Sequence, residues 1–108
     1  MKKVAIIFGN NNGLPGVEKD CNRIEAFLRS PLGGCWIDDE ILYLPFEITA
    51  NELEEILFHI KQLNLDYAFV YFSGHGGSRS QQTILEINSN GEFLLLTEVI
   101  IIETIADI

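Results

Sequence analysis

The sequence has 108 residues, a length that suits one domain or part of one. Hydrophobic residues make up 47% and charged residues 21%, a balance that excludes a disordered chain. The 16 acidic residues outnumber the 7 Lys and Arg residues, and the formal net charge of −9 disfavours nucleic acid and anionic membranes as partners.

The sequence also limits which targeting segments and cysteine motifs the chain can contain. The first apolar run, VAIIF, is far too short to cross a bilayer, so neither a signal peptide nor a membrane span is predicted. Cys21 and Cys35 match neither a disulfide framework nor a C-x-x-C motif. We therefore expect a reducing, cytoplasmic setting, no metal or other cofactor, and two cysteines that act as small buried hydrophobic residues.

The N-terminal part of the chain alternates apolar strands with an amphipathic helix. Residues Lys2–Phe8 are continuously apolar after the two lysines, which predicts a strand covered on both faces. Residues 17–30 then predict a helix that ends at Pro31, with an apolar stripe of Val17, Cys21, Ile24, Phe27 and Leu28. The segment Glu40–Phe46 predicts a second strand, and Pro45 places it at a sheet edge or at a strand end.

The clearest predicted helix follows the second strand. Thr49 and Glu52 have the spacing of a capping box, and the apolar stripe behind them comprises Leu53, Ile56, Leu57, Ile60 and Leu63. Residues Asp66–Phe72, DYAFVYF, predict a third buried strand. Beyond it, TILEIN and EFLLLT flank SNGE, which predicts a β-hairpin, whereas EVIIIETIAD fits a helix or a strand.

This order of elements predicts an α/β fold with a mostly parallel sheet and helices on both of its faces. Ligands and chemistry gather at the carboxyl ends of the strands in such sheets. The segments GNNNG and SGHGG each follow a predicted strand, so the pattern places both on one rim of the sheet.

The first rim segment, GNNNGLPG, fits either a phosphate-binding loop or a plain turn. It lies between a strand and a helix, but it matches neither G-x-G-x-x-G nor a P-loop. Glu18 and Asp20 open the helix, where their charges would compete with phosphate. The turn, rich in Asn and Gly for its backbone conformation, is the favoured interpretation.

The second rim segment contains His75 between glycines. His-Gly-Gly also occurs in the oxyanion holes of lipases, but the G-x-S-x-G nucleophile motif is missing from this sequence. An imidazole at a strand end can instead serve as the base for a thiol. The local pattern leaves this role and a purely structural hydrogen-bonding role both open. The other histidine, His59, lies off the apolar stripe of its helix and is expected to be solvated.

Two segments together resemble caspase-like cysteine peptidases, the group that includes caspases and metacaspases. FVYFSGHGG is similar to their histidine segment, and LPGVEKDCNRIEAFL resembles the metacaspase pattern Leu-x-Gly-Cys-x-x-Asp, with Val17 in place of the cysteine. The resemblance implies a caspase-like three-layer sandwich. Residues 1–108 would form a single, partial catalytic domain, the large-subunit-like N-terminal half.

The resemblance also implies a cysteine-type endopeptidase with a Cys–His dyad that acts on protein or peptide substrates. His75 would be the general base and acid, and the Gly76 amide would be one oxyanion donor. Asp20 matches the residue that lines the substrate pocket in metacaspase-like members, which suggests cleavage after Arg or Lys. Asp20 also fits a simpler role as a first-turn residue favoured by the helix dipole.

One departure from the family pattern concerns the nucleophile. In caspases it lies about 50 residues beyond the histidine, near position ~125 here, whereas the sequence ends at Ile108. We therefore expect a Cys-bearing C-terminal subunit or second chain that completes the sheet beside the third strand. The alternatives are a caspase-like pseudo-subunit that acts as an interaction or regulatory module, and, less favoured, a small nucleotide-binding domain that uses GNNNG.

Overall fold

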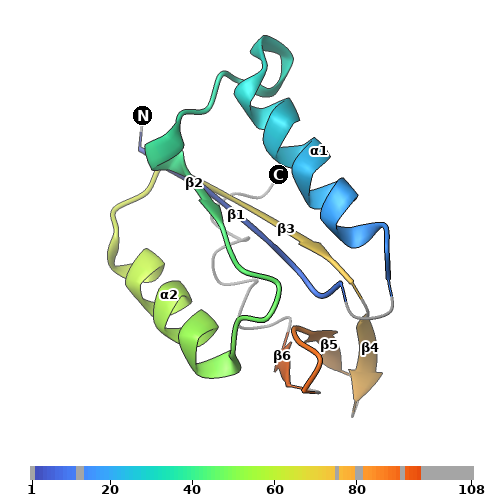
Figure 1. Ribbon diagram of the computed structural model, residues 1–108. Helices are drawn as coiled ribbons and strands as arrows, with labels where there is room; N and C mark the ends of the chain where they lie inside the picture. The colour runs from blue at the N-terminus through green and yellow to red at the C-terminus, as the bar shows by residue number, and fades with distance from the viewer. Residues whose placement is uncertain (1, 12–13, 75, 80–81, 91, 96–108) are drawn as a thin grey trace.

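The computed structural model describes residues 2–11, 14–74, 76–79, 82–90 and 92–95. Within these ranges, two helices alternate with the first three of six strands, and the last three strands follow without a helix between them (Figure 1). In chain order they are β1 (Lys3–Gly9), α1 (Val17–Arg29), β2 (Ile41–Tyr43), α2 (Ala50–Gln62), β3 (Tyr67–Ser73), β4 (Gly76–Arg79), β5 (Gln82–Glu86) and β6 (Phe93–Leu95). Two short 3-10 turns, Pro31–Gly33 and Asp38–Glu40, connect α1 to β2.

The first three strands form a parallel sheet in the order β2-β1-β3. All seven residues of β1 pair with β3, and Gly9 lies opposite Ser73 at the last position. The carboxyl ends of β1 and β3 therefore meet at one rim, as the sequence predicted. Among the described residues, no strand pairs with the other edge of β3.

The helices cover opposite faces of this sheet, which gives the three predicted layers (Figure 1). Successive side chains of a strand point to opposite faces, so alternate residues of β1 enter two different cores. The core on the α2 side contains Val4, Ile6, Phe8, Leu53, Leu57 and Ile60. The core on the α1 side contains Ala5, Ile7, Val17, Cys21, Leu28 and Trp36. Each fully buried Leu or Ile contributes roughly 1.5–3 kcal/mol of transfer free energy.

Local signals in the sequence explain where α2 begins and where β2 ends. The Thr49 side chain accepts a hydrogen bond from the Glu52 amide and the Glu52 carboxylate accepts one from the Thr49 amide, so the predicted capping box is confirmed. β2 is shorter than predicted and lies at the sheet edge. Leu44 still donates to the Ile7 carbonyl at 2.9 Å, but Pro45 has no N–H, and the ladder stops there.

A second, antiparallel sheet, β4-β5-β6, lies beside the carboxyl ends of β1 and β3 (Figure 1). The predicted hairpin is confirmed as β5 and β6, in which Glu86 lies opposite Phe93. β4 was not predicted, because Gly-Gly-Ser-Arg has little strand propensity. It forms through pairing with β5, with Gly76 opposite Leu85. The ambiguous EVIIIETIAD segment lies outside the described residues.

Two predictions for individual side chains were wrong. Phe27 belongs to the predicted apolar stripe of α1, yet 52% of its surface is exposed, because α1 packs over β1 and leaves Phe27 at the side of the contact. Cys35 was expected to be buried, but it is exposed in the connection between the two 3-10 turns, where its φ is +54°. Neither helix in the described ranges is long and apolar enough to cross a membrane.

Candidate active site

The rim where β1 and β3 end is closely packed. The Asn10 amide donates a 3.0 Å hydrogen bond to the Ser73 carbonyl oxygen. Gly74 has a φ of +154°, and a Cβ atom there would lie 3.2 Å from the backbone nitrogen and oxygen of Asn10. A glycine next to the histidine is therefore required by the backbone conformation and by the close approach of the two rim segments.

His75 itself lies outside the described residues, so its predicted role stays a prediction. Residues close to it on either side in the sequence belong to two different strands. Ser73 ends β3 and is tied to Asn10, whereas Gly76 begins β4 opposite Leu85 of β5. In the sequence, His75 therefore lies between the last strand of the parallel sheet and the first strand of the antiparallel sheet.

Asp20 is close to this rim although it belongs to the first turn of α1. Asp20 is partly buried. Burial raises the pKa of the Tyr71 hydroxyl on β3, and the negative charge of Asp20 is the second-largest cause of this rise. A hydrogen bond between Tyr71 and the Ser73 side chain opposes this rise in pKa. Asp20, Tyr71 and Ser73 therefore form one polar group near the end of β3. Within the described side chains, Asp20 has no salt-bridge partner.

Cys21 is buried beneath the rim, where it has a structural role. Its Sγ lies 3.9 Å from the Phe8 carbonyl oxygen, and it packs in the core on the α1 side. Burial, followed by the charge of Asp20, raises the pKa of the Cys21 thiol. A thiol with a raised pKa holds its proton at neutral pH, so Cys21 is a poor nucleophile.

Cys35 is exposed, but it lies at the opposite end of the sheet. Its neighbour Trp36 packs against Tyr67, the first residue of β3, with ring centroids 6.0 Å apart. Ser73 is six residues further along the same strand, a separation of about 20 Å at the ~3.3 Å rise of a parallel strand. Cys35 is therefore far outside hydrogen-bond reach of the rim.

The remaining candidates from the sequence are His59, the first rim segment and a possible metal site. His59 is exposed on α2, as predicted. Asn10, in the first rim segment, is fully buried, and its side-chain amide donates to the Asn88 carbonyl at 3.3 Å. This contact fits the interpretation of the segment as a structural turn. Residues 12 and 13 of the segment are outside the described ranges. Among described side chains, no three His, Cys, Asp or Glu residues gather as metal ligands would.

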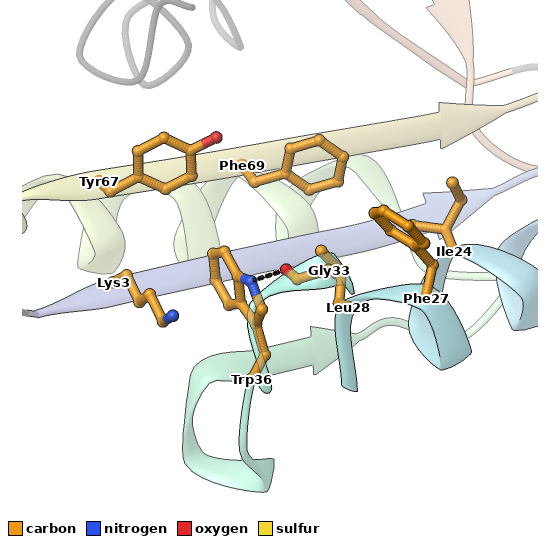
Figure 2. A pocket seen from close by; sticks show the side chains of 8 residues that line it. All are labelled: Lys3, Ile24, Phe27, Leu28, Gly33, Trp36, Tyr67 and Phe69. Atoms are coloured by element: carbon orange, nitrogen blue, oxygen red, sulfur yellow. Dashed lines mark hydrogen bonds between the residues drawn. The ribbon is translucent and has the colours of Figure 1, made fainter. Parts of the chain in front are cut away.

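A separate apolar cavity of about 440 Å³ lies between α1 and β3, at the end of the sheet that holds Cys35. Figure 2 shows its lining, which comprises Lys3, Ile24, Phe27, Leu28, Gly33, Trp36, Tyr67 and Phe69. The Trp36 indole donates to the Gly33 carbonyl at 2.9 Å, and the Lys3 ammonium lies 4.4 Å from the Trp36 ring centroid. The lining offers no acid–base pair and no thiol, so this cavity is not a candidate reaction site.

Sequence reasoning missed the polar residues that support the rim. Tyr71 and Asn88 were assigned only to strands, and Asn10 only to a turn. The available signal was an asparagine directly after a buried strand or in a hairpin turn, and that pattern is common in turns with no further role.

Comparison with known protein families matches residues 2–107 to the caspase domain. Comparisons with curated proteins and with solved structures gave no match. The family match covers almost the whole chain and includes both the α1 opening and the histidine segment. With this match, and with a parallel sheet covered on both faces, this chain belongs to the caspase domain family of cysteine peptidases.

Proposed function

We propose that this chain carries the general base of a Cys–His endopeptidase, and that the base is His75. The proposal rests on two residues close to His75 in the sequence, Ser73 and Gly76, which are both held by backbone hydrogen bonds. Ser73 is held by Asn10, and Gly76 lies in the β4–β5 ladder, so backbone hydrogen bonds hold a residue close to His75 in sequence on each side of it. A base must be held within hydrogen-bond reach of its nucleophile, and two short anchors provide that restraint.

The reaction follows from cysteine chemistry. His75 accepts the thiol proton, and the thiolate attacks the carbonyl carbon of the scissile peptide bond. The Gly76 amide, with its N–H next to the histidine, stabilises the oxyanion that forms. The C–N bond then breaks, the leaving amine takes the proton from His75, and water hydrolyses the thioester.

The nucleophile lies outside these 108 residues, in a further segment of the protein or in a second chain. Cys21 is buried with a raised pKa, and Cys35 is at the wrong end of the sheet. We propose that the segment with the nucleophile pairs with the edge of β3 away from β1. Its residues are apolar and aromatic, yet all but Ala68 are only partly buried, and the edge away from β1 is unpaired within the described residues. A strand added there would end beside His75.

Substrate preference follows from Asp20. Its carboxylate lies by the rim beside Tyr71 and has no salt-bridge partner among the described side chains, so it is free to bind a cationic substrate residue. The net charge of −9 also favours basic peptides. Cleavage after Arg or Lys is therefore the proposed specificity.

The test uses the full-length protein, together with any chain that co-purifies with it, and peptide substrates that end in Arg, Lys or Asp. A His75→Ala variant is expected to lose hydrolysis at least 1,000-fold, because removal of a general base and dyad partner is that costly. His59→Ala, at the only other histidine, is the matched control and should keep full activity. Full activity of His75→Ala would refute the proposal.

A second candidate is a caspase-like pseudo-subunit that acts as an interaction or regulatory module. It is favoured by the two unsuitable cysteines together with the unpaired β3 edge and the neighbouring apolar cavity, which fit a binding surface without chemistry. Mass analysis of the purified assembly discriminates the two functions. A Cys-bearing strand segment in the assembly supports the peptidase, and its absence from a stable assembly supports the pseudo-subunit.

A further inference from the structure

Two asparagines from distant parts of the chain form an unusual buried contact. Among the described residues, Asn10 and Asn88 are the only polar side chains that are buried, and both are fully inaccessible. They are 78 positions apart in sequence, and the Asn10 side-chain amide donates to the Asn88 carbonyl at 3.3 Å. Burying an amide is costly unless its hydrogen bonds are made, so this arrangement requires compensation from the surroundings.

The Asn88 side chain receives that compensation at both of its ends. Its Nδ2 donates to the Ile48 carbonyl at 2.9 Å and to Glu92 Oε1 at 2.8 Å. Its Oδ1 accepts from the amides of Asn90 at 3.0 Å and Glu92 at 3.4 Å. One side chain thereby shapes the turn between β5 and β6 and ties that turn to the segment before α2.

These contacts link the two segments that flank the histidine in the sequence. On one side, the Asn10 amide holds the Ser73 carbonyl at the end of β3. On the other side, Gly76 of β4 pairs with Leu85 of β5, and β5 leads directly to Asn88. The bond from Asn10 to Asn88 joins the two sides. The parallel and antiparallel sheets of Figure 1 are thus joined by this asparagine pair.

We infer that Asn10 and Asn88 are positioning residues, which set the placement of the histidine segment by locking the antiparallel sheet onto the parallel one. This inference rests on the proposed function only where it concerns turnover. An amide can donate and accept in fixed directions, and an apolar contact cannot impose such a geometry. The pair therefore controls the orientation of β4 relative to β3, and so the alignment of His75 with the incoming thiol.

The first test is independent of activity and uses amide hydrogen exchange in the full-length protein. Asn88→Asp keeps the size of the side chain, removes both Nδ2 hydrogen bonds and places a second carboxylate beside Glu92. We expect exchange at residues 76–79 to accelerate at least 10-fold, with residues 4–8 of β1 changed less than 2-fold. Asn51→Ala, at an exposed asparagine of α2, is the control and should change neither set.

A compensating variant separates positioning from general destabilisation. Glu92→Gln added to Asn88→Asp supplies an amide donor opposite the new carboxylate, and it should recover at least half of the lost protection at residues 76–79. Equal acceleration across β1 and β4 in Asn88→Asp, or no acceleration in β4, would overturn the inference. Should Asn88→Asp fail to fold, Asn10→Ser provides the same comparison with a smaller change.

The second test is kinetic. In the active assembly, Asn88→Asp should lower kcat at least 10-fold with KM within 2-fold, because substrate binding is kept and base alignment is lost. A rise in KM with unchanged kcat would contradict positioning. If the wild-type assembly hydrolyses no peptide, the proposed peptidase function fails, whereas the exchange experiment still decides whether the asparagine pair fixes β4.

Discussion

Gly9 is in direct contact with Ser73, the residue that ends β3 two positions before His75. A Cβ atom on Gly9 would lie 2.6 Å from the Ser73 carbonyl oxygen and 2.8 Å from Val17 Cγ1. The first of these neighbours is backbone and cannot rotate away. Only a glycine allows β1, β3 and the start of α1 to meet at this point, so the rim depends on this close approach.

The Gly9→Ala variant should therefore lose about 1–3 kcal/mol of unfolding free energy, the usual cost of overpacking. Urea unfolding measures the change, and the loss of hydrolysis should exceed what the unfolded fraction explains, because Ser73 must move. Gly16→Ala is the control: a Cβ atom there has no neighbour within 4 Å, and its φ is −83°. If both variants were equally stable, the close approach would have no energetic role.

Asp20→Asn should change both the substrate preference and the pKa of Tyr71. Loss of a charge-assisted hydrogen bond costs about 1.5–3 kcal/mol, so kcat/KM for Arg and Lys peptides should fall roughly 10- to 100-fold. Since the Asp20 charge raises the pKa of Tyr71, its removal should lower that pKa in a spectrophotometric titration. Glu18→Gln, on the exposed side of the same helical turn, serves as the control. An unchanged Tyr71 pKa would place Asp20 away from the rim.

Cys35→Gly should stabilise the protein. Cys35 has a φ of +54°, and a left-handed conformation costs a residue with a Cβ atom about 1–2 kcal/mol. Glycine removes that strain but loses roughly 0.5–1 kcal/mol more backbone entropy on folding, so the net gain is about 0.5–1 kcal/mol. Chemical denaturation measures it. Cys35→Ala keeps the strained backbone conformation and should leave the unfolding free energy unchanged. A gain in stability as large as that of Cys35→Gly would instead show that removal of the thiol, and not relief of strain, stabilises the protein.

The capping box of α2 should make stability depend on pH through Glu52. Hydrogen bonds from the Thr49 backbone, and then from its side chain, lower the pKa of Glu52. A lowered pKa in the folded state stabilises the protein above the unfolded value, about 4.3, and this contribution disappears as the pH falls through the folded value. Wild type should therefore be more stable than Glu52→Ala at neutral pH, with a difference that shrinks below about pH 4. A difference between wild type and Glu52→Ala of equal size above and below that pH would contradict this assignment.

The fold was largely predictable because its strongest signals are local. The apolar run of β1, the capping box at Thr49 and the Asn-Gly of the hairpin each specify one element without reference to the rest of the chain. Chain order and the right-handed crossover rule then predict the rim. These signals require no knowledge of which side chains touch.

The features that the sequence did not reveal depend on contacts between distant residues. β4 is a strand because β5 is available to pair with it, and Asn10 is buried because Asn88 accepts its hydrogen bond. Phe27 follows helical spacing, but its exposure depends on how far α1 extends over β3. For the site, the sequence identified His75, Gly76 and Asp20 as candidates, and only the fold places Asp20 beside Tyr71.

The proposed role of His75 is to activate a cysteine from outside these 108 residues. The most direct measurement uses an Arg-terminated peptidyl chloromethyl ketone on the full-length protein with its co-purifying chains, followed by mass-spectrometric mapping of the modified residue. The account predicts one labelled cysteine outside residues 1–108, with labelling at least 100-fold slower in His75→Ala and unchanged in His59→Ala. Labelling of Cys21 or Cys35, or labelling at an outside cysteine at the same rate in His75→Ala, would contradict it.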